Sequence, residues 1–241
     1  EMCIRDRNRI ISFYAEQITN SLTRNKLTIS QSETATSVIK NPYVVADVPD
    51  YLEVEILEGT KSRKIRQYKG FLIDLTYFTN TNSYLLYQLS KRNRKNLISK
   101  LKKLENNHQV SYKMYYGSID KKHYDFLFDI FYKLFDRRFK EKRVYNKNLI
   151  KWKYYYNLLY PMILENRASF FVIYDKEKPI DITLNYHLGD IVFSFMHTYD
   201  TDYSKYNLGD ISMVKLIDWC FEHQIPIFDL SIGETGQKIK W

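Results

Sequence analysis

The chain has 241 residues, of which 44% are hydrophobic and 27% are charged, and its formal net charge is +9. This is the composition of a globular protein, and it excludes a disordered chain or a fibre. Its two cysteines, Cys3 and Cys220, are too few for a disulfide framework or for a zinc site built from clustered ligands, so we expect no metal. No apolar run reaches the roughly 18–20 residues that cross a bilayer, and no secretory signal opens the chain, which predicts a soluble, cytoplasmic protein.

The N-terminal part predicts a short accessory region. Residues 1–7 resemble a translated sequencing adapter, and we treat them as a non-native leader. Apolar residues at spacings of three and four between Asn8 and about Asn25 predict an amphipathic helix. Alternating apolar residues then predict two strands, at 51–57 and 64–75. We therefore assign residues 8–75 to an accessory N-terminal region and residues 76–241 to the main domain.

The segment from Ser83 to Leu104 predicts a basic amphipathic helix that restarts at Ser90 as an N-cap. One stripe carries leucines, and the remaining positions supply seven positive charges without one acid: Lys91, Arg92, Arg94, Lys95, Lys100, Lys102 and Lys103. These charges suit either contact with nucleic-acid phosphates or a solvated helix face. We favour the solvated face, because lysines dominate and no nucleic-acid module signature accompanies them.

The rest of the chain predicts a mixed sheet with helices. A strand at Val110–Tyr116 precedes a core helix centred on Leu127, and a third helix over about 147–160 ends or kinks at Pro161. Three antiparallel strands follow, then a helix opening at Gly209-Asp210 and a short strand after Pro226; the strands are expected at 168–174, 180–188, 191–199 and 227–230. The fold class is thus α/β (α+β), with a β-meander followed by a right-handed β-α-β crossover.

Particular residues go beyond this order of elements. The segments Tyr199-Asp200 to Asp210, Phe228 to Glu234, and Gln237-Lys238 to Trp241 resemble the FemAB-like branch of the GNAT acyltransferase superfamily, which includes the acetyltransferase-like domain of cellulose-biosynthesis-type proteins. The resemblance covers roughly residues 72–241. Leu208-Gly209 replaces the family's Pro-Gly, and Gln237-Lys238 replaces its Tyr-Lys or Phe-Lys. Members of this branch continue with a further helix and a β-hairpin, so we expect that the C-terminal hairpin is missing.

The resemblance implies an acyltransferase, in particular an N-acetyltransferase, that uses acyl-CoA (acetyl-CoA) as co-substrate. The acceptor would be an amine or hydroxyl, for example on an amino sugar or a cell-envelope precursor. A helix N-terminus offers free N–H groups to the CoA phosphates, and Gly209 would let them approach closely. The cofactor-binding residues implied are Thr198, Tyr199, Leu208, Gly209, Asp210 and Ile211.

Acyl transfer also needs a base, a stabilised oxyanion and a proton for the leaving thiolate. His197 on the third meander strand is our candidate base, and the loop residues Tyr203 and Tyr206 are candidate acids. Asp229, Glu234 and Lys238 are candidate substrate-binding residues at the end of the last strand. Each of these also fits a structural role, and we expect the remaining histidines, His108, His123, His187 and His223, to be structural.

Two other functions remain open. A FemAB-type transferase would take its acyl group from aminoacyl-tRNA, and the basic helix would then bind tRNA. A protein of a different class, a non-catalytic basic module for nucleic acid or another partner, would bind without consuming a thioester. The sequence names neither the acceptor nor the oligomeric state.

Overall fold

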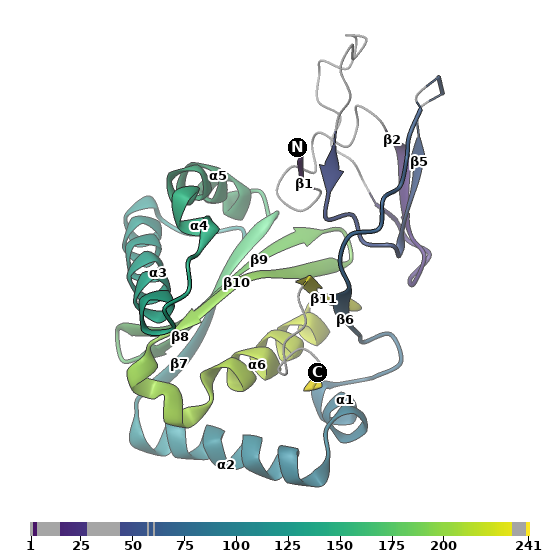
Figure 1. Ribbon diagram of the computed structural model, residues 1–241. Helices are drawn as coiled ribbons and strands as arrows, with labels where there is room; N and C mark the ends of the chain where they lie inside the picture. Colours follow the sequence, from purple (N-terminus) through teal and green to yellow (C-terminus); the bar gives the residue numbers. More distant parts are fainter. Residues whose placement is uncertain (1, 4–14, 28–43, 57, 60, 233–239) are drawn as a thin grey trace.

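The computed structural model describes residues 2–3, 15–27, 44–56, 58–59, 61–232 and 240–241 (Figure 1). At its centre is a six-stranded sheet of order β6-β11-β10-β9-β8-β7. Its strands are β6 (Gly70–Asp74), β7 (Val110–Tyr115), β8 (Ala168–Asp175), β9 (Lys178–Leu188), β10 (Ile191–Tyr199) and β11 (Ile227–Ile232). Neighbouring strands are antiparallel except β10 and β11, which are parallel. The predicted mixed α+β sheet with its meander is confirmed.

Helices cover both faces of this sheet (Figure 1). One face carries α1 (Thr81–Gln88), α2 (Lys91–Asn107) and α6 (Leu208–Glu222), and the other carries α3 (Lys121–Glu141), α4 (Lys147–Ile150) and α5 (Trp152–Leu164). A 3-10 helix, η2 (Thr201–Tyr206), joins β10 to α6. Each interface has its own core of buried apolar side chains. Among the described residues, no helix is both long and apolar enough to pass through a membrane.

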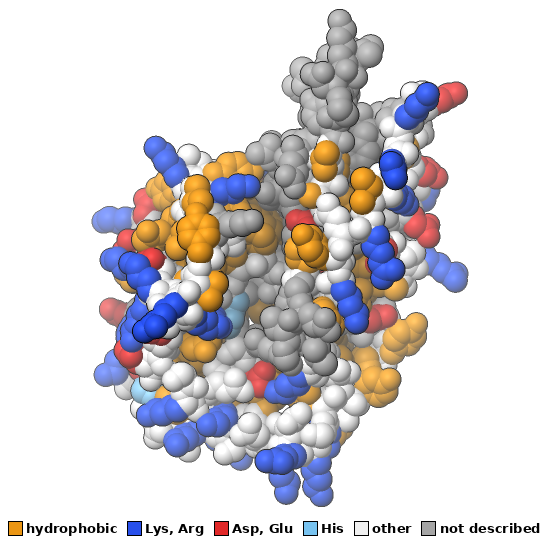
Figure 2. Space-filling model, in the orientation of Figure 1, with side chains coloured by type: hydrophobic (Ala, Val, Ile, Leu, Met, Phe, Trp, Pro, Cys, Tyr) orange, Lys and Arg blue, Asp and Glu red, His pale blue; other side chains and the backbone are white. Residues whose placement is uncertain are grey.

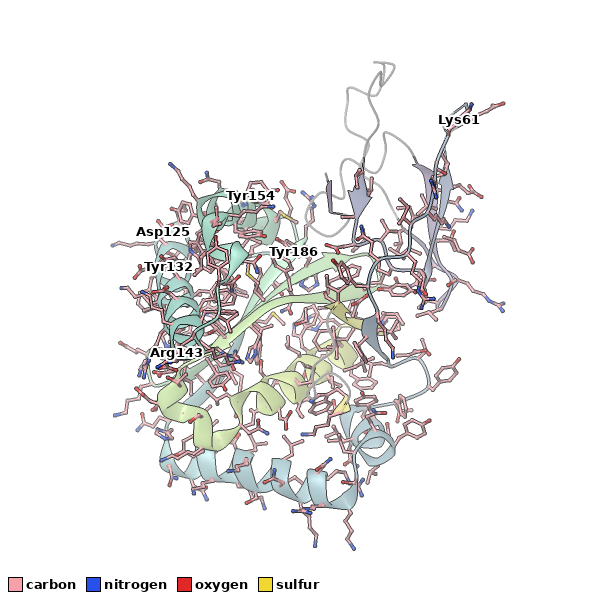
Figure 3. The ribbon with its side chains drawn as sticks, in the orientation of Figure 1. Lys61, Asp125, Tyr132, Arg143, Tyr154 and Tyr186 are labelled. Carbon is pink, nitrogen blue, oxygen red and sulfur yellow. The ribbon has the colours of Figure 1, made fainter. Side chains whose placement is uncertain are left out.

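The central strand β9 presents two chemically different faces. The side chains of Ile182, Leu184, Leu188 and the Tyr186 labelled in Figure 3 belong to the core beneath α3 and α5. Its opposite face is polar: the Thr183 hydroxyl lies 3.1 Å from that of Ser212 on α6, and the His187 ring lies 5.5 Å from Trp219 on the same helix. Burying polar groups is costly unless they find hydrogen-bond partners. The polar residues of β9 therefore favour the packing of α6, which supplies such partners, over that of a purely apolar helix.

The N-terminal part forms small sheets beside the turn between β9 and β10. One has β2 (Ala15–Asn20), β3 (Lys26–Leu27) and β5 (Leu52–Ile56), and another pairs β1 (Met2–Cys3) with β4 (Val45–Ala46). The Asp190 carboxylate in the turn accepts hydrogen bonds from Asn20 (3.1 Å) and Asn25 (2.9 Å). Gly189 has a φ of +56°, and a Cβ there would lie 2.6 Å from Leu27 Cδ2, so the close approach requires glycine. The accessory region therefore docks directly on the meander.

Three expectations about local structure were wrong. The helix predicted from Asn8 to Asn25 is, in its described part, the strand β2 and the turn to β3, because Ile18 is fully buried in pairing with β5. The strand predicted at 64–75 begins only at Gly70, and residues 70–74 belong to the main sheet as the edge strand β6. The third helix does not end at Pro161: α5 continues to Leu164, and Ile163 beyond the proline is fully buried, while a kink at Pro161 stays a prediction.

The buried polar face gives the fold a defined response to acid. Burial lowers the pKa of His187 from its ordinary 6.5 to about 3. Between these values the unfolded chain binds a proton at this residue and the folded chain does not, so stability falls as the pH falls. We expect His187 to contribute a slope of about 1.4 kcal/mol per pH unit to the free energy of unfolding in this window. Urea unfolding between pH 6.5 and 4 should show a shallower slope in His187→Gln, and equal slopes would contradict this.

Candidate active site

The site is built where the two parallel strands separate. β10 and β11 pair only from Ile191 with Ile227 to Phe193 with Asp229; beyond this level β10 pairs with β9 alone and β11 with β6 alone. The Asp200 N–H donates to Ile180 O (2.8 Å) and so points toward β9. Along a strand, the backbone N–H and C=O groups of successive residues point to opposite sides, so those of His197 and Tyr199 point toward the side of β11. A ligand entering the opening would meet these groups, apart from the His197 carbonyl, which already accepts a hydrogen bond from Arg138.

His197 forms a buried pair with a carboxylate in this part of β10. Its Nε2 lies 2.7 Å from Asp181 Oδ2 on β9, and the Asp181 side chain is fully buried while that of His197 is 21% exposed. If Nε2–H donates to the carboxylate, Nδ1 is left as the acceptor. Asp181 Oδ1 has no hydrogen-bond partner among the described residues. The sequence did not point to Asp181; the one available signal was an acid inside an otherwise buried strand.

Two arginines tie the end of α3 to the end of β10. Arg138 Nη1 donates to His197 O (3.2 Å), and its guanidinium lies 4.5 Å from the centre of the Tyr199 ring. Arg137 makes an ion pair of 2.8 Å with Asp202 in η2. The carbonyl of His197 is therefore held by a cationic donor, which fixes the backbone around the candidate base. These arginines carried no signal in the sequence beyond their charge.

The N-terminus of α6 lies directly after β10 and η2. Asn207 precedes it in a left-handed conformation (φ 58°), and its side-chain amide donates to Asp210 Oδ2 (2.5 Å). The backbone N–H groups of Leu208 and Gly209 have no partner among the described residues. Asp210 is buried and is paired with Lys240 and with the indole N–H of Trp241 (3.2 Å). The cation beside this carboxylate reduces its repulsion of an anion at the helix N-terminus.

The two candidate tyrosines belong to a different cluster. Asp175 Oδ2 accepts hydrogen bonds from Tyr203 Oη (2.8 Å) and His108 Nδ1 (2.7 Å), and His108 Nε2 lies 3.0 Å from Tyr206 Oη. Burial and then the hydrogen bond to Asp175 raise the pKa of Tyr203 to about 12, whereas the hydrogen bond from Asn107 lowers that of Tyr206. Among the described residues, no hydrogen bond joins this cluster to His197. His108, expected to be structural, is the link between the two tyrosines.

The remaining predicted residues divide between buried and undescribed positions. Asp229 is 7% exposed, and its carboxylate accepts hydrogen bonds from Tyr51 Oη (2.7 Å) and the Ser231 N–H (2.5 Å). Thr198 is fully buried and Ile211 nearly so. Glu234 and Lys238 lie outside the described residues. The described residues contain no group of three or more His, Cys, Asp or Glu that could hold a metal.

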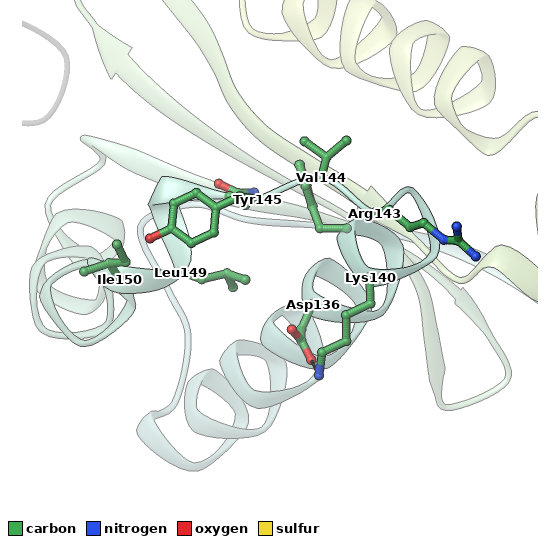
Figure 4. Close-up of a pocket in the computed structure, with 9 residues that line it drawn as sticks. Asp136, Lys140, Arg143, Val144, Tyr145, Leu149 and Ile150 are labelled. Atoms are coloured by element: carbon green, nitrogen blue, oxygen red, sulfur yellow. Dashed lines mark hydrogen bonds and ion pairs between the residues drawn. The ribbon is translucent and has the colours of Figure 1, made fainter.

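Two surface grooves lie away from these residues. The first, of about 450 Å³, lies between the end of α3 and α4; in Figure 4 Tyr145 and Leu149 line it opposite the ion pair of Asp136 and Lys140 (2.7 Å). The second runs along the basic α2 past Lys95 and Lys102. Neither groove contains a residue predicted for the site, so we build the candidate site on the strand ends and the α6 N-terminus.

Comparison with known proteins identifies the family. The family model described as "Acetyltransferase (GNAT) domain" matches residues 91–238, which is more than half of the chain. The chain belongs to the GNAT acetyltransferase family. The superfamily predicted from the sequence is thereby confirmed, and its FemAB-like branch stays a prediction. No curated protein matches the chain.

Solved structures resemble this GNAT domain only in part. One is a conserved protein of unknown function from Bacteroides thetaiotaomicron VPI-5482, with 11% identity, a TM-score of 0.49, and coverage of 72% of this chain and 55% of that one. Another is the C-terminal domain of a putative lysylphosphatidylglycerol synthetase from Agrobacterium fabrum, with 11% identity, a TM-score of 0.47, and coverage of 69% and 46%. The chain thus spans about half the length of these structures.

The tyrosine cluster should contribute measurably to stability. Asp175 accepts three hydrogen bonds, from Tyr203, His108 and the N–H of Gln109. Asp175→Asn should lower the free energy of unfolding by about 1–3 kcal/mol in urea titration, because partly buried donors lose their charged acceptor. The control Asp129→Asn removes only an exposed ion pair to Lys133 and should change it by less than about 0.5 kcal/mol. Equal effects of the two variants would contradict the role given to Asp175.

Proposed function

We propose that this GNAT domain transfers an acyl group from acyl-CoA to an amine or hydroxyl acceptor by direct attack. The observation that carries the proposal is the His197–Asp181 pair, which lies on β10 beyond the level at which β11 separates. A histidine held by a buried carboxylate is an arrangement suited to a general base. The family match supports the reaction class, and the pair supplies the group that the reaction needs.

His197 would take the proton from the acceptor. The Nε2–H bond to Asp181 fixes the ring and its tautomer, so that Nδ1 can accept the proton as the acceptor attacks the thioester carbonyl. The buried carboxylate then stabilises the imidazolium that forms. The backbone of His197, like that of Tyr199, faces the opening, so the base and the attacked carbonyl would lie close together on β10.

The α6 N-terminus would bind the donor. The N–H groups of Leu208 and Gly209 and the partial positive charge of the helix favour the CoA phosphates. Lys240 neutralises the one acid of the first turn, Asp210. The thioester arm would then run along the open side of β10, past Tyr199 and His197. Thr198 and Ile211 are buried, so we assign them to support of this binding surface.

The leaving thiolate needs a proton, for which Tyr203 and Tyr206 remain our candidates. With its pKa raised to about 12, Tyr203 keeps its proton at neutral pH. Because both tyrosines lie in the cluster of His108 and Asp175, the acid and the base come from separate hydrogen-bonded groups. Glu234 and Lys238 stay candidates for acceptor binding, and the acceptor proposed is an amino sugar or a cell-envelope precursor.

If the donor were aminoacyl-tRNA, the basic helix α2 would bind the tRNA. Lys and Arg side chains gather over α2 at the lower edge of the molecule in Figure 2. Part of this charge serves the fold: Arg94 donates to Leu86 O (3.2 Å), and Lys100 donates to Lys205 O (2.6 Å). These bonds are the reason that we prefer acyl-CoA as donor.

A thiol-release assay with acetyl-CoA and glucosamine tests the proposal. His197→Gln should lower kcat by about 100-fold or more and Asp181→Asn by about 10-fold or more, with little change in KM for acetyl-CoA, because both act in the chemical step. Free imidazole should restore part of the activity to His197→Ala. The control is His223→Gln, which changes an exposed histidine near the far end of α6 and should leave kcat within twofold.

The same experiment separates the alternatives. Absence of both acetyl-CoA binding in calorimetry and thiol release would overturn the acyl-CoA proposal. Binding of tRNA that is lost in Lys95→Glu and Lys102→Glu would then favour the aminoacyl-tRNA-dependent transferase. Binding of nucleic acid or another partner without consumption of any thioester would favour a non-catalytic module.

A further inference from the structure

The opening between β10 and β11 is bridged at its base by side chains. Both strands are irregular at the same level: β10 shifts its register between Ser194 and Met196, and β11 between Asp229 and Ile232. Ser231 Oγ donates to Ser194 O across the gap, at a distance of 2.9 Å. The backbone hydrogen bonds between β10 and β11 end just before this level. The bond from Ser231 to Ser194 therefore links the two strands at one further position.

Ser231 is held in place by a carboxylate. Its φ of 62° is a left-handed conformation that a non-glycine residue adopts at a cost, and its N–H donates to Asp229 Oδ1 (2.5 Å). The other oxygen, Asp229 Oδ2, accepts the hydroxyl of Tyr51 (2.7 Å). Tyr51 and Asp229 are each 7% exposed, so the hydrogen bond between them is protected from water, while the two bonds of Ser231 are part-buried.

Tyr51 comes from the accessory N-terminal region, beside β5, whereas the other members belong to the GNAT fold. Removing its hydroxyl would leave a buried carboxylate with one donor fewer. The small sheets are therefore connected to the base of the opening by a hydrogen-bonded chain, in addition to their contact with the turn at Gly189 and Asp190.

We propose that the chain Tyr51–Asp229–Ser231–Ser194 sets the separation of β10 and β11 and so preorganises the opening for the thioester arm of acyl-CoA. This inference rests on the proposed function. It makes Tyr51 and Ser231 positioning residues, and it gives Asp229 the role of holding Ser231 rather than of touching substrate. A preformed opening lowers the entropy cost of ordering the two strands when the donor binds. Removing one of these hydrogen bonds should therefore weaken binding of the donor.

The test is a double-variant cycle read by calorimetry with acetyl-CoA. Tyr51→Phe and Ser231→Ala each remove one hydroxyl, and Ala at position 231 meets the same left-handed backbone as Ser. Each should raise the dissociation constant about fivefold. Because the bonds act in series, the double variant should resemble either single variant, whereas independent structural effects would multiply. The matched control is Tyr112→Phe on β7, the opposite edge strand, which removes a hydroxyl that donates to Glu105 on α2. The dissociation constant of this variant should stay within twofold of the wild type.

Hydrogen exchange of the ligand-free protein separates this inference from the proposed function. Tyr51→Phe should speed exchange at residues 194–197 and 229–232 while the core helix α3 exchanges as in the wild type. Unchanged exchange at these residues, or a multiplicative effect in the double variant, would overturn the positioning chain even if the wild type binds acetyl-CoA. If the wild type fails to bind acetyl-CoA, both the proposed function and the role of the hydrogen-bonded chain in donor binding are overturned. Faster local exchange in Tyr51→Phe would then show that these hydrogen bonds only stabilise the structure.

Discussion

The separation of two parallel strands is the constraint on which the rest of the structure depends. β10 and β11 are joined through α6, pair over three residues, and then diverge because each has a different antiparallel partner. Divergence frees the backbone of β10 around His197 and places the N-terminus of α6 after its end. Backbone polar groups released in this way need partners, and a substrate with amide and phosphate groups can supply them.

The polar face of β9 lies on the side of the sheet where we propose that the chemistry takes place. A central strand of a two-sided sheet is expected to be apolar on both faces, yet Asp181 and Thr183 are buried toward α6. Asp181 supports the candidate base, and Thr183 bonds Ser212 on the helix that would hold the donor. The same row of side chains thus packs against α6 and, under the proposed function, would also orient the reacting group.

Local patterns predicted most of the main domain, because its strands and helices alternate with clear periods and turns such as Gly189-Asp190. They failed for residues 15–25, where pairing with β5, distant in sequence, outweighs the helical spacing. For the candidate site, His197 was proposed from its place on the third meander strand, whereas the sequence did not point to Asp181, Arg138 or Tyr51. Each acts through a contact between elements far apart in the chain, for which a single sequence contains no direct signal.

We propose that acyl-CoA binds along the end of β10 and at the N-terminus of α6. The most direct measurement is hydrogen exchange by mass spectrometry with and without acetyl-CoA. We predict that the ligand slows exchange over residues 195–199 and 207–211, where the open strand and the helix N-terminus lie, and leaves α3 and β7 unchanged. Acetyl-CoA that binds without slowing exchange in either segment, or that protects only α2, would contradict the account.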